Sequence, residues 1–177
     1  VVGPASINGL ETCRKAFHDY LRSRLARMGR TAPDYYGVED VDDLPYLASL
    51  PERAGLHERR LYYDSARFKF VLTAMYYAQI TRAAEKVFPK VHTYCNFSPH
   101  PPMFGQDMNG SDWFALTRGG GANMAWGECW AGRDGGWGFT GFDVVSYYAA
   151  CVECAARVRG GLPGGFYVVG GMGGSDN

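Results

Sequence analysis

The spacing of apolar residues predicts three long helices. Apolar side chains recur every three or four positions over residues 11–28, 65–87 and 142–158, which is the period of a helix with one buried face. Gly29 follows the first helix and Pro89 follows the second. Glycine just past a helix and proline shortly after it are common helix-ending signals. The first two helices therefore have predicted ends as well as predicted buried faces.

The first two helices are joined by a long connection, residues 29–60, that is rich in Pro, Asp and Tyr and shows no sustained period. A connection of this length without secondary structure is uncommon, so we expect a short helix around residues 41–50. At its far end, Asp64 or Ser65 is expected to cap the next helix by accepting a backbone N–H bond.

Short runs rich in β-branched and aromatic residues predict three strands, at residues 91–97, 122–126 and 166–169. A short helix at 112–117, capped by Ser111, separates the first two strands, and the third long helix separates the second and third. Strands that alternate with helices belong to parallel sheets. The sequence therefore predicts an α/β fold with parallel strands, in a single domain spanning residues 1–177.

Composition and charge limit the classes of partner. The 177 residues carry 18 Lys plus Arg and 18 Asp plus Glu. The net charge is thus zero, and no basic face for nucleic acid is implied. No run of 18 apolar residues exists, so we expect no transmembrane helix and no membrane partner. The first ten residues lack the basic and apolar regions of a signal peptide, and the sequence leaves localisation and oligomeric state open.

The cysteines indicate no cofactor. Five cysteines without regular spacing do not form a disulfide framework. Cys151 and Cys154 form a CxxC inside the third predicted helix, whereas a redox CxxC belongs at a helix N-terminus, and zinc would require a second pair of ligands. We expect no metal and no cofactor, with a redox or metal protein built on this pair as a minor alternative.

Polar and aromatic residues gather where the first two predicted strands end. Asn96 lies at the end of the first strand and His100 follows it, and Trp126 ends the second strand, with Glu128 and Trp130 just after it. Because parallel strands end at the same edge of a sheet, we expect these side chains to line one mouth. Aromatic faces and hydrogen-bonding groups together suit a carbohydrate, which is the predicted partner.

Between these strand ends lie Trp113 and Arg118, which we also assign to substrate binding. The indoles on either side of Glu128 would exclude water and favour its neutral form, which suits a general acid. The alternative is a structural ion pair between Glu128 and Arg118 or Arg133.

Several short segments, in this order, resemble the clan A glycoside hydrolases of the bacterial β-galactosidase type (family forty-two). They are Tyr63-Asp64-Ser65-Ala66-Arg67-Phe68, His92-Thr93-Tyr94-Cys95-Asn96-Phe97, Asp112-Trp113-Phe114, Ala125-Trp126-Gly127-Glu128 and Gly165-Phe166-Tyr167-Val168-Val169. The resemblance implies a (β/α)8 barrel of which this chain holds about strands five to seven. It also implies hydrolysis of an O-glycosidic bond, and an open partial barrel that is inactive and poorly soluble alone.

This chain departs from the family at both of the family's catalytic positions. The family's acid/base Glu would lie before Val1, and its nucleophile aligns with Gly170 or Gly171. Glu128 is then the only carboxylate at a predicted strand end. Glycoside hydrolysis requires two carboxyl groups. We therefore predict a glycoside hydrolase that uses Glu128 and a second carboxylate elsewhere, with a non-catalytic carbohydrate-binding barrel as the alternative.

Overall fold

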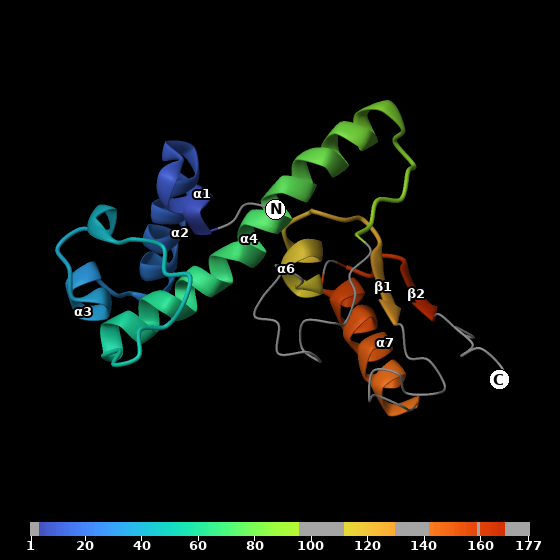
Figure 1. The fold of residues 1–177 in the computed structure, drawn as a ribbon. Coiled ribbons are helices and arrows are strands. Elements are labelled where there is room, and N and C mark those ends of the chain that lie inside the picture. The colour runs from blue at the N-terminus through green and yellow to red at the C-terminus, as the bar shows by residue number, and fades with distance from the viewer. Residues whose placement is uncertain (1–3, 96–111, 130–141, 159, 169–177) are drawn as a thin grey trace, which may run out of the picture. The chain divides into compact units, whose positions relative to one another are not determined.

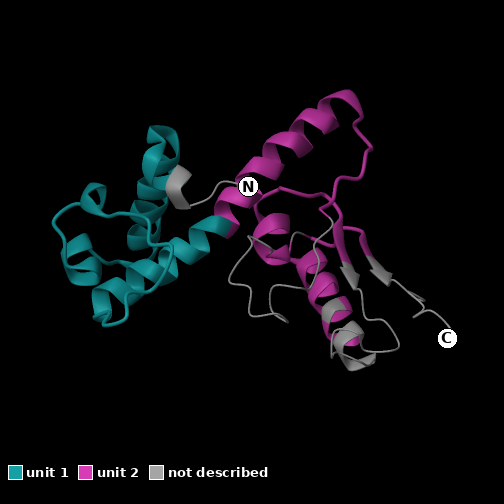
Figure 2. Cartoon of the chain, viewed as in Figure 1, with its two compact units in different colours: residues 1–69 teal, residues 70–177 magenta. Residues whose placement is uncertain are grey.

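The computed structural model describes residues 4–95, 112–129, 142–158 and 160–168 (Figure 1). Within these ranges the chain forms six α-helices, one 3-10 helix and one sheet of two strands. It divides into two compact units, residues 1–69 and 70–177 (Figure 2). Helix α4 (Leu56–Val87) contributes residues to both units.

The predicted fold class is wrong. The described part of the chain is mainly helical, with only two short strands, and it is not a segment of a (β/α)8 barrel. The first predicted strand shows the physical reason. Residues 91–95 form no strand, because the backbone of Thr93 bonds to Asn123 and Met124 and not to a strand ladder. Residues 96 and 97 lie outside the described part.

Unit 1 consists of helices packed on an aromatic core. Its elements are α1 (Pro4–Gly9), α2 (Glu11–Met28), α3 (Ala32–Tyr36), the 3-10 helix η1 (Val41–Asp43) and the first part of α4. The extent of α2 is as predicted, and Gly29 ends it with φ of 62°, a left-handed conformation that glycine adopts without strain. Phe17 of α2 packs against Phe68 of α4, with ring centroids 5.2 Å apart, and against Tyr46 at 5.5 Å.

Helix α4 begins at Leu56, well before the predicted start at Ser65. The backbone N–H of Gly55 donates to Glu58 Oε2 at 2.7 Å. In a capping box, the carboxylate at the third helical position accepts from the backbone N–H of the N-cap residue in this way. The prediction that Asp64 or Ser65 caps this helix is wrong, because both are fully buried in its interior. Ser65 instead accepts a hydrogen bond from the backbone N–H of Leu47 at 3.1 Å.

Asp64 joins three helices of unit 1. The hydroxyl of Tyr36 in α3 donates to Asp64 Oδ2 at 2.9 Å, and Arg24 of α2 forms an ion pair with Oδ1 that is not aligned as a hydrogen bond. Burial raises the pKa of Asp64 above its ordinary value, against the opposing effects of Tyr36 and Arg24. The carboxylate therefore holds α2, α3 and α4 together while carrying a desolvation cost.

Unit 2 contains a strand-helix-strand segment. Its elements after α4 are α6 (Trp113–Arg118), β1 (Ala125–Cys129), α7 (Phe142–Arg157) and β2 (Gly164–Val168). The third long helix is confirmed by α7, and β1 and β2 pair in parallel. Val152 and Ala156 of α7 pack on Ala125 of β1, so α7 lies beside the sheet (Figure 1).

The second part of α4 packs on α6 and the residues that lead into β1. Tyr77 contacts a small core of Cys95, Leu116 and Ala122. Thr81 donates to the carbonyl of Gly121 at 3.0 Å. Burial raises the pKa of the Cys95 thiol to about 11, and the hydrogen bond with Tyr77 opposes this only in part. Cys95 is therefore an unreactive thiol in this fold.

Candidate functional site

The candidate site is built on the pairing of β1 with β2. In this parallel register Trp126 lies opposite Gly165, and Glu128 lies opposite Tyr167. The carboxyl ends of both strands therefore point the same way, as the sequence predicted for this pair. Among the described residues, the site thus rests on two strands and one helix, and they form no barrel.

The indole of Trp126 lies across the backbone of β2. A Cβ added to Gly165 would overlap the six-membered ring of Trp126, and it would stand 3.1 Å from Cε of Met124. Glycine within a strand often marks such a close approach. The absence of a side chain at Gly165 therefore sets the position of this indole.

Tyr94 extends the aromatic surface that Trp126 begins. The two ring centroids are 4.9 Å apart, with the ring planes inclined by 38°. Tyr94 is 51% exposed and Trp126 is half-buried. We call this pair the aromatic face. It offers a ligand two adjacent rings, one of them largely open to solvent.

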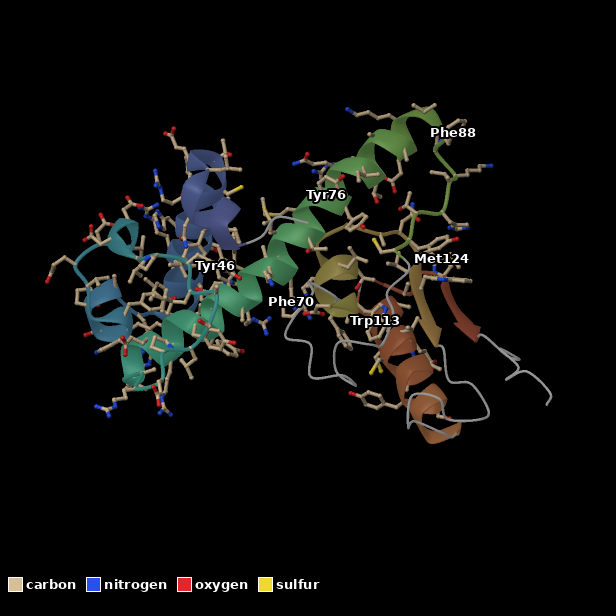
Figure 3. All side chains as sticks on the ribbon, in the orientation of Figure 1. Tyr46, Phe70, Tyr76, Phe88, Trp113 and Met124 are labelled. Carbon is tan, nitrogen blue, oxygen red and sulfur yellow. The ribbon has the colours of Figure 1, made fainter. Side chains whose placement is uncertain are left out.

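Trp113 supports the aromatic face from behind the strand. Its indole N–H donates to the backbone carbonyl of Trp126 at 2.9 Å. Trp113 opens α6, and the residue that caps this helix is Asp112, whose Oδ1 accepts from the N–H of Ala115 at 2.9 Å. The predicted cap at Ser111 is corrected accordingly. Figure 3 labels Trp113 at α6 and Met124 at the start of β1.

The predicted site residues divide into three groups. Trp126 and Trp113 are brought together by the hydrogen bond just described. Arg118 ends α6 with its side chain exposed, and Glu128 belongs to β1, although its side chain lies outside the described part. Three further positions lie outside the described residues altogether, namely Asn96, His100 and Trp130. Their assignment to the site stays a prediction.

Two residues of this site were missed from the sequence. The sequence predicts Tyr94 only as part of a strand, and no local pattern shows that its ring meets that of Trp126. The sequence places Gly165 only at the start of the segment Gly165-Phe166-Tyr167-Val168-Val169, which resembles a family strand. The glycine pair 164–165 was the available signal, because glycines in a strand indicate close approach by another group.

In unit 2, each carboxylate whose side chain is described already has a hydrogen-bond or ion-pair partner. Glu85 accepts from Nδ2 of Asn123 at 2.9 Å, Asp112 caps α6, and Glu153 pairs with Arg157 on α7. No group of three or more His, Cys, Asp or Glu among the described residues could hold a metal ion. In α7, Cys151 is half-buried and Cys154 is exposed, and both are free thiols.

A shallow cavity of about 430 Å³ lies between α7 and the turn into β2. Val152, Ala156 and Leu162 give it an apolar lining, and its charged lining residues, Glu153 and Arg157, pair with each other. The charged groups of the cavity are thus engaged with each other, whereas the aromatic face offers a ligand two adjacent rings, and we take the aromatic face as the candidate site.

Comparisons with known proteins identify no relative of this chain. No family model, no curated protein and no solved structure is significantly similar to this chain.

Proposed function

We propose that unit 2 binds a carbohydrate on the aromatic face formed by Tyr94 and Trp126. The observation that carries this proposal is the pairing of their rings at 4.9 Å with Tyr94 open to solvent. Aromatic side chains present large, flat apolar surfaces at low entropic cost, and such surfaces match the C–H faces of a pyranose ring.

The fixed position of Trp126 strengthens the proposal. Its backbone pairs with β2, its carbonyl accepts from Trp113, and its indole lies across Gly165. A ring held in this way loses little conformational freedom when a ligand binds, so more of the contact energy appears as affinity.

Hydrolysis of an O-glycosidic bond by Glu128 is a second candidate. Glu128 stands two positions after Trp126 in β1. A carboxyl group placed beside a stacked sugar would suit the acid/base or nucleophile role that the resemblance to bacterial β-galactosidases implies. The second carboxylate would have to come from outside Glu85, Asp112 and Glu153, which are engaged elsewhere.

Binding is tested by a glycan array and by titration calorimetry with the sugars that the array selects. Trp126→Ala and Tyr94→Ala should each weaken binding by about tenfold or more, because each removes one ring of the face. Tyr94→Phe is the matched control, since it keeps the ring and should bind within about threefold of the original chain. Equal binding by Tyr94→Ala and Tyr94→Phe would reject the aromatic face.

Catalysis is tested with a panel of 4-nitrophenyl glycosides. If Glu128 is catalytic, Glu128→Gln should lower kcat at least about a hundredfold while sugar binding is retained. If the unsubstituted chain binds a sugar but hydrolyses none of the glycosides, the binding function stands and hydrolysis is rejected. Full activity of Glu128→Gln would reject the assignment of Glu128 alone.

A further inference from the structure

Helix α4 exposes an apolar stripe within unit 2. Tyr76, Ile80, Ala83 and Val87 follow one another at intervals of four, three and four residues, so they lie on one face of the helix. Tyr76 is 60% exposed, Ile80 44% and Val87 68%, and Ala83 is also exposed. The opposite face is buried in unit 2 through Ala74, Ala78 and Thr81.

One more large apolar side chain is exposed just past the end of the helix. Phe88 follows Val87 directly and is 64% exposed. Figure 3 shows Tyr76 along α4 and Phe88 at its end. Large exposed side chains in a continuous row mark a surface that binds something, because single exposed apolar residues are common but contiguous ones are not.

The charges beside this stripe are cationic. Arg82, Lys86 and Lys90 are exposed, and Lys86 lies next to the stripe, three positions after Ala83 on the helix surface. The one acidic residue between positions 70 and 90 is Glu85. It lies on the inward side, where it accepts the hydrogen bond from Asn123. The exposed face therefore combines apolar groups with cations and presents no carboxylate between these positions.

We propose that this face of α4 docks on an anionic phospholipid surface. An amphipathic helix lies in the plane of a membrane when apolar residues enter the interface and flanking Lys and Arg reach the phosphate groups. Tyr76 and Phe88 supply the aromatic groups that favour this depth. The cations supply the complementary charge, since anionic lipids attract basic segments.

A second copy of the chain fits the face less well. If this face met itself in a second copy, neither copy would offer an exposed carboxylate between positions 70 and 90 to the cations Lys86 and Lys90. The expectation that the protein has no membrane partner rested on the lack of a spanning segment. Among the described residues no helix is long and apolar enough to cross a bilayer. Docking on the surface requires no such helix.

The test is sedimentation of the 177-residue chain with vesicles of phosphatidylcholine, alone or with roughly a third phosphatidylserine. The chain should bind the anionic vesicles and leave them at high salt. The double variant Lys86→Gln, Lys90→Gln should bind about 25-fold more weakly, about fivefold per cation. Val87→Asp should bind at least about tenfold more weakly, and circular dichroism checks that its helix content is unchanged.

The matched control is Arg14→Gln, Arg27→Gln, which removes two exposed cations from α2. It should bind within about twofold of the original chain. Equal loss in this control, equal binding to neutral vesicles or no vesicle binding would each overturn the proposal. Self-association that Val87→Asp abolishes, in the absence of vesicle binding, would overturn it in favour of a second copy.

Discussion

The hydroxyl of Tyr36 donates a 2.9 Å hydrogen bond to Oδ2 of Asp64, a carboxylate that is fully buried in α4. This contact joins the short helix α3 to the core of unit 1. Burial raises the pKa of Tyr36 well above its ordinary value, so the hydroxyl keeps its proton and stays a donor at neutral pH. The stability of unit 1 therefore depends on a polar contact inside its helical core.

Replacing Tyr36 with Phe should lower the free energy of unfolding by about 1.5–3 kcal/mol, the usual cost of removing a hydrogen bond to a charged group. Urea denaturation followed by circular dichroism measures the change. Tyr35→Phe is the control, because it removes a hydroxyl from the neighbouring, half-buried ring, and its effect should stay within about 0.5 kcal/mol. Equal effects of the two variants would show that the Asp64 contact contributes nothing specific.

The pH dependence of stability should carry the signature of Asp64. An unfolded Asp titrates near a pKa of about 3.9, and burial raises the pKa of Asp64 above this in the fold. The folded state then binds more protons in the window above pH 4. The contribution of this group is therefore fully present below about pH 4 and is lost as the pH rises through the raised pKa.

Denaturation series from about pH 3.5 to 7 on the original chain and on Asp64→Asn measure this contribution. The difference between the two curves isolates Asp64 from other carboxylates such as Asp19, whose pKa is lowered by the hydrogen bond with Lys15 and which therefore acts in the opposite direction. Parallel curves would contradict the prediction.

Gly165→Ala should displace the indole of Trp126, because the new Cβ would overlap its ring. We expect a loss of about 1–3 kcal/mol in the free energy of unfolding, as for other overpacked sites, and a change in near-ultraviolet circular dichroism. Gly164→Ala is the matched control one residue away, where the Cβ would meet only Ala125 O at 3.7 Å and Ala156 Cβ at 3.8 Å. A Gly165→Ala variant with unchanged stability and spectrum would mean that Trp126 does not lie across β2.

The helices could be predicted from the sequence where one face is uniformly buried. The apolar spacing in α2 places Phe17, Leu21 and Leu25 on the buried side, and Gly29 gives its end. The start of α4 could not be placed in this way, because Asp64 and Ser65 are polar yet buried. Their partners, Tyr36 and Leu47, lie 28 and 18 positions away in the sequence, which no local pattern reveals.

The fold class failed for a related reason. Whether residues 91–95 form a strand depends on a neighbouring strand, and here the side chain of Asn123 takes the place of that neighbour by accepting from the N–H of Thr93 and donating to the carbonyl of Val91. At the candidate site, Trp126 was found as an aromatic residue in a predicted strand. Its partner Tyr94 and its contact with Gly165 are tertiary relationships that periodicity does not report.

The alkylation rate of the buried Cys95 thiol can serve as a measure of the opening of unit 2. A buried thiol with a pKa of about 11 reacts with alkylating reagents mainly after the core of Tyr77, Leu116 and Ala122 opens. Cys154 on the surface of α7 reacts without any opening and provides the internal reference. The ratio of the two labelling rates therefore reports how often this core opens in the intact chain, without an introduced cysteine.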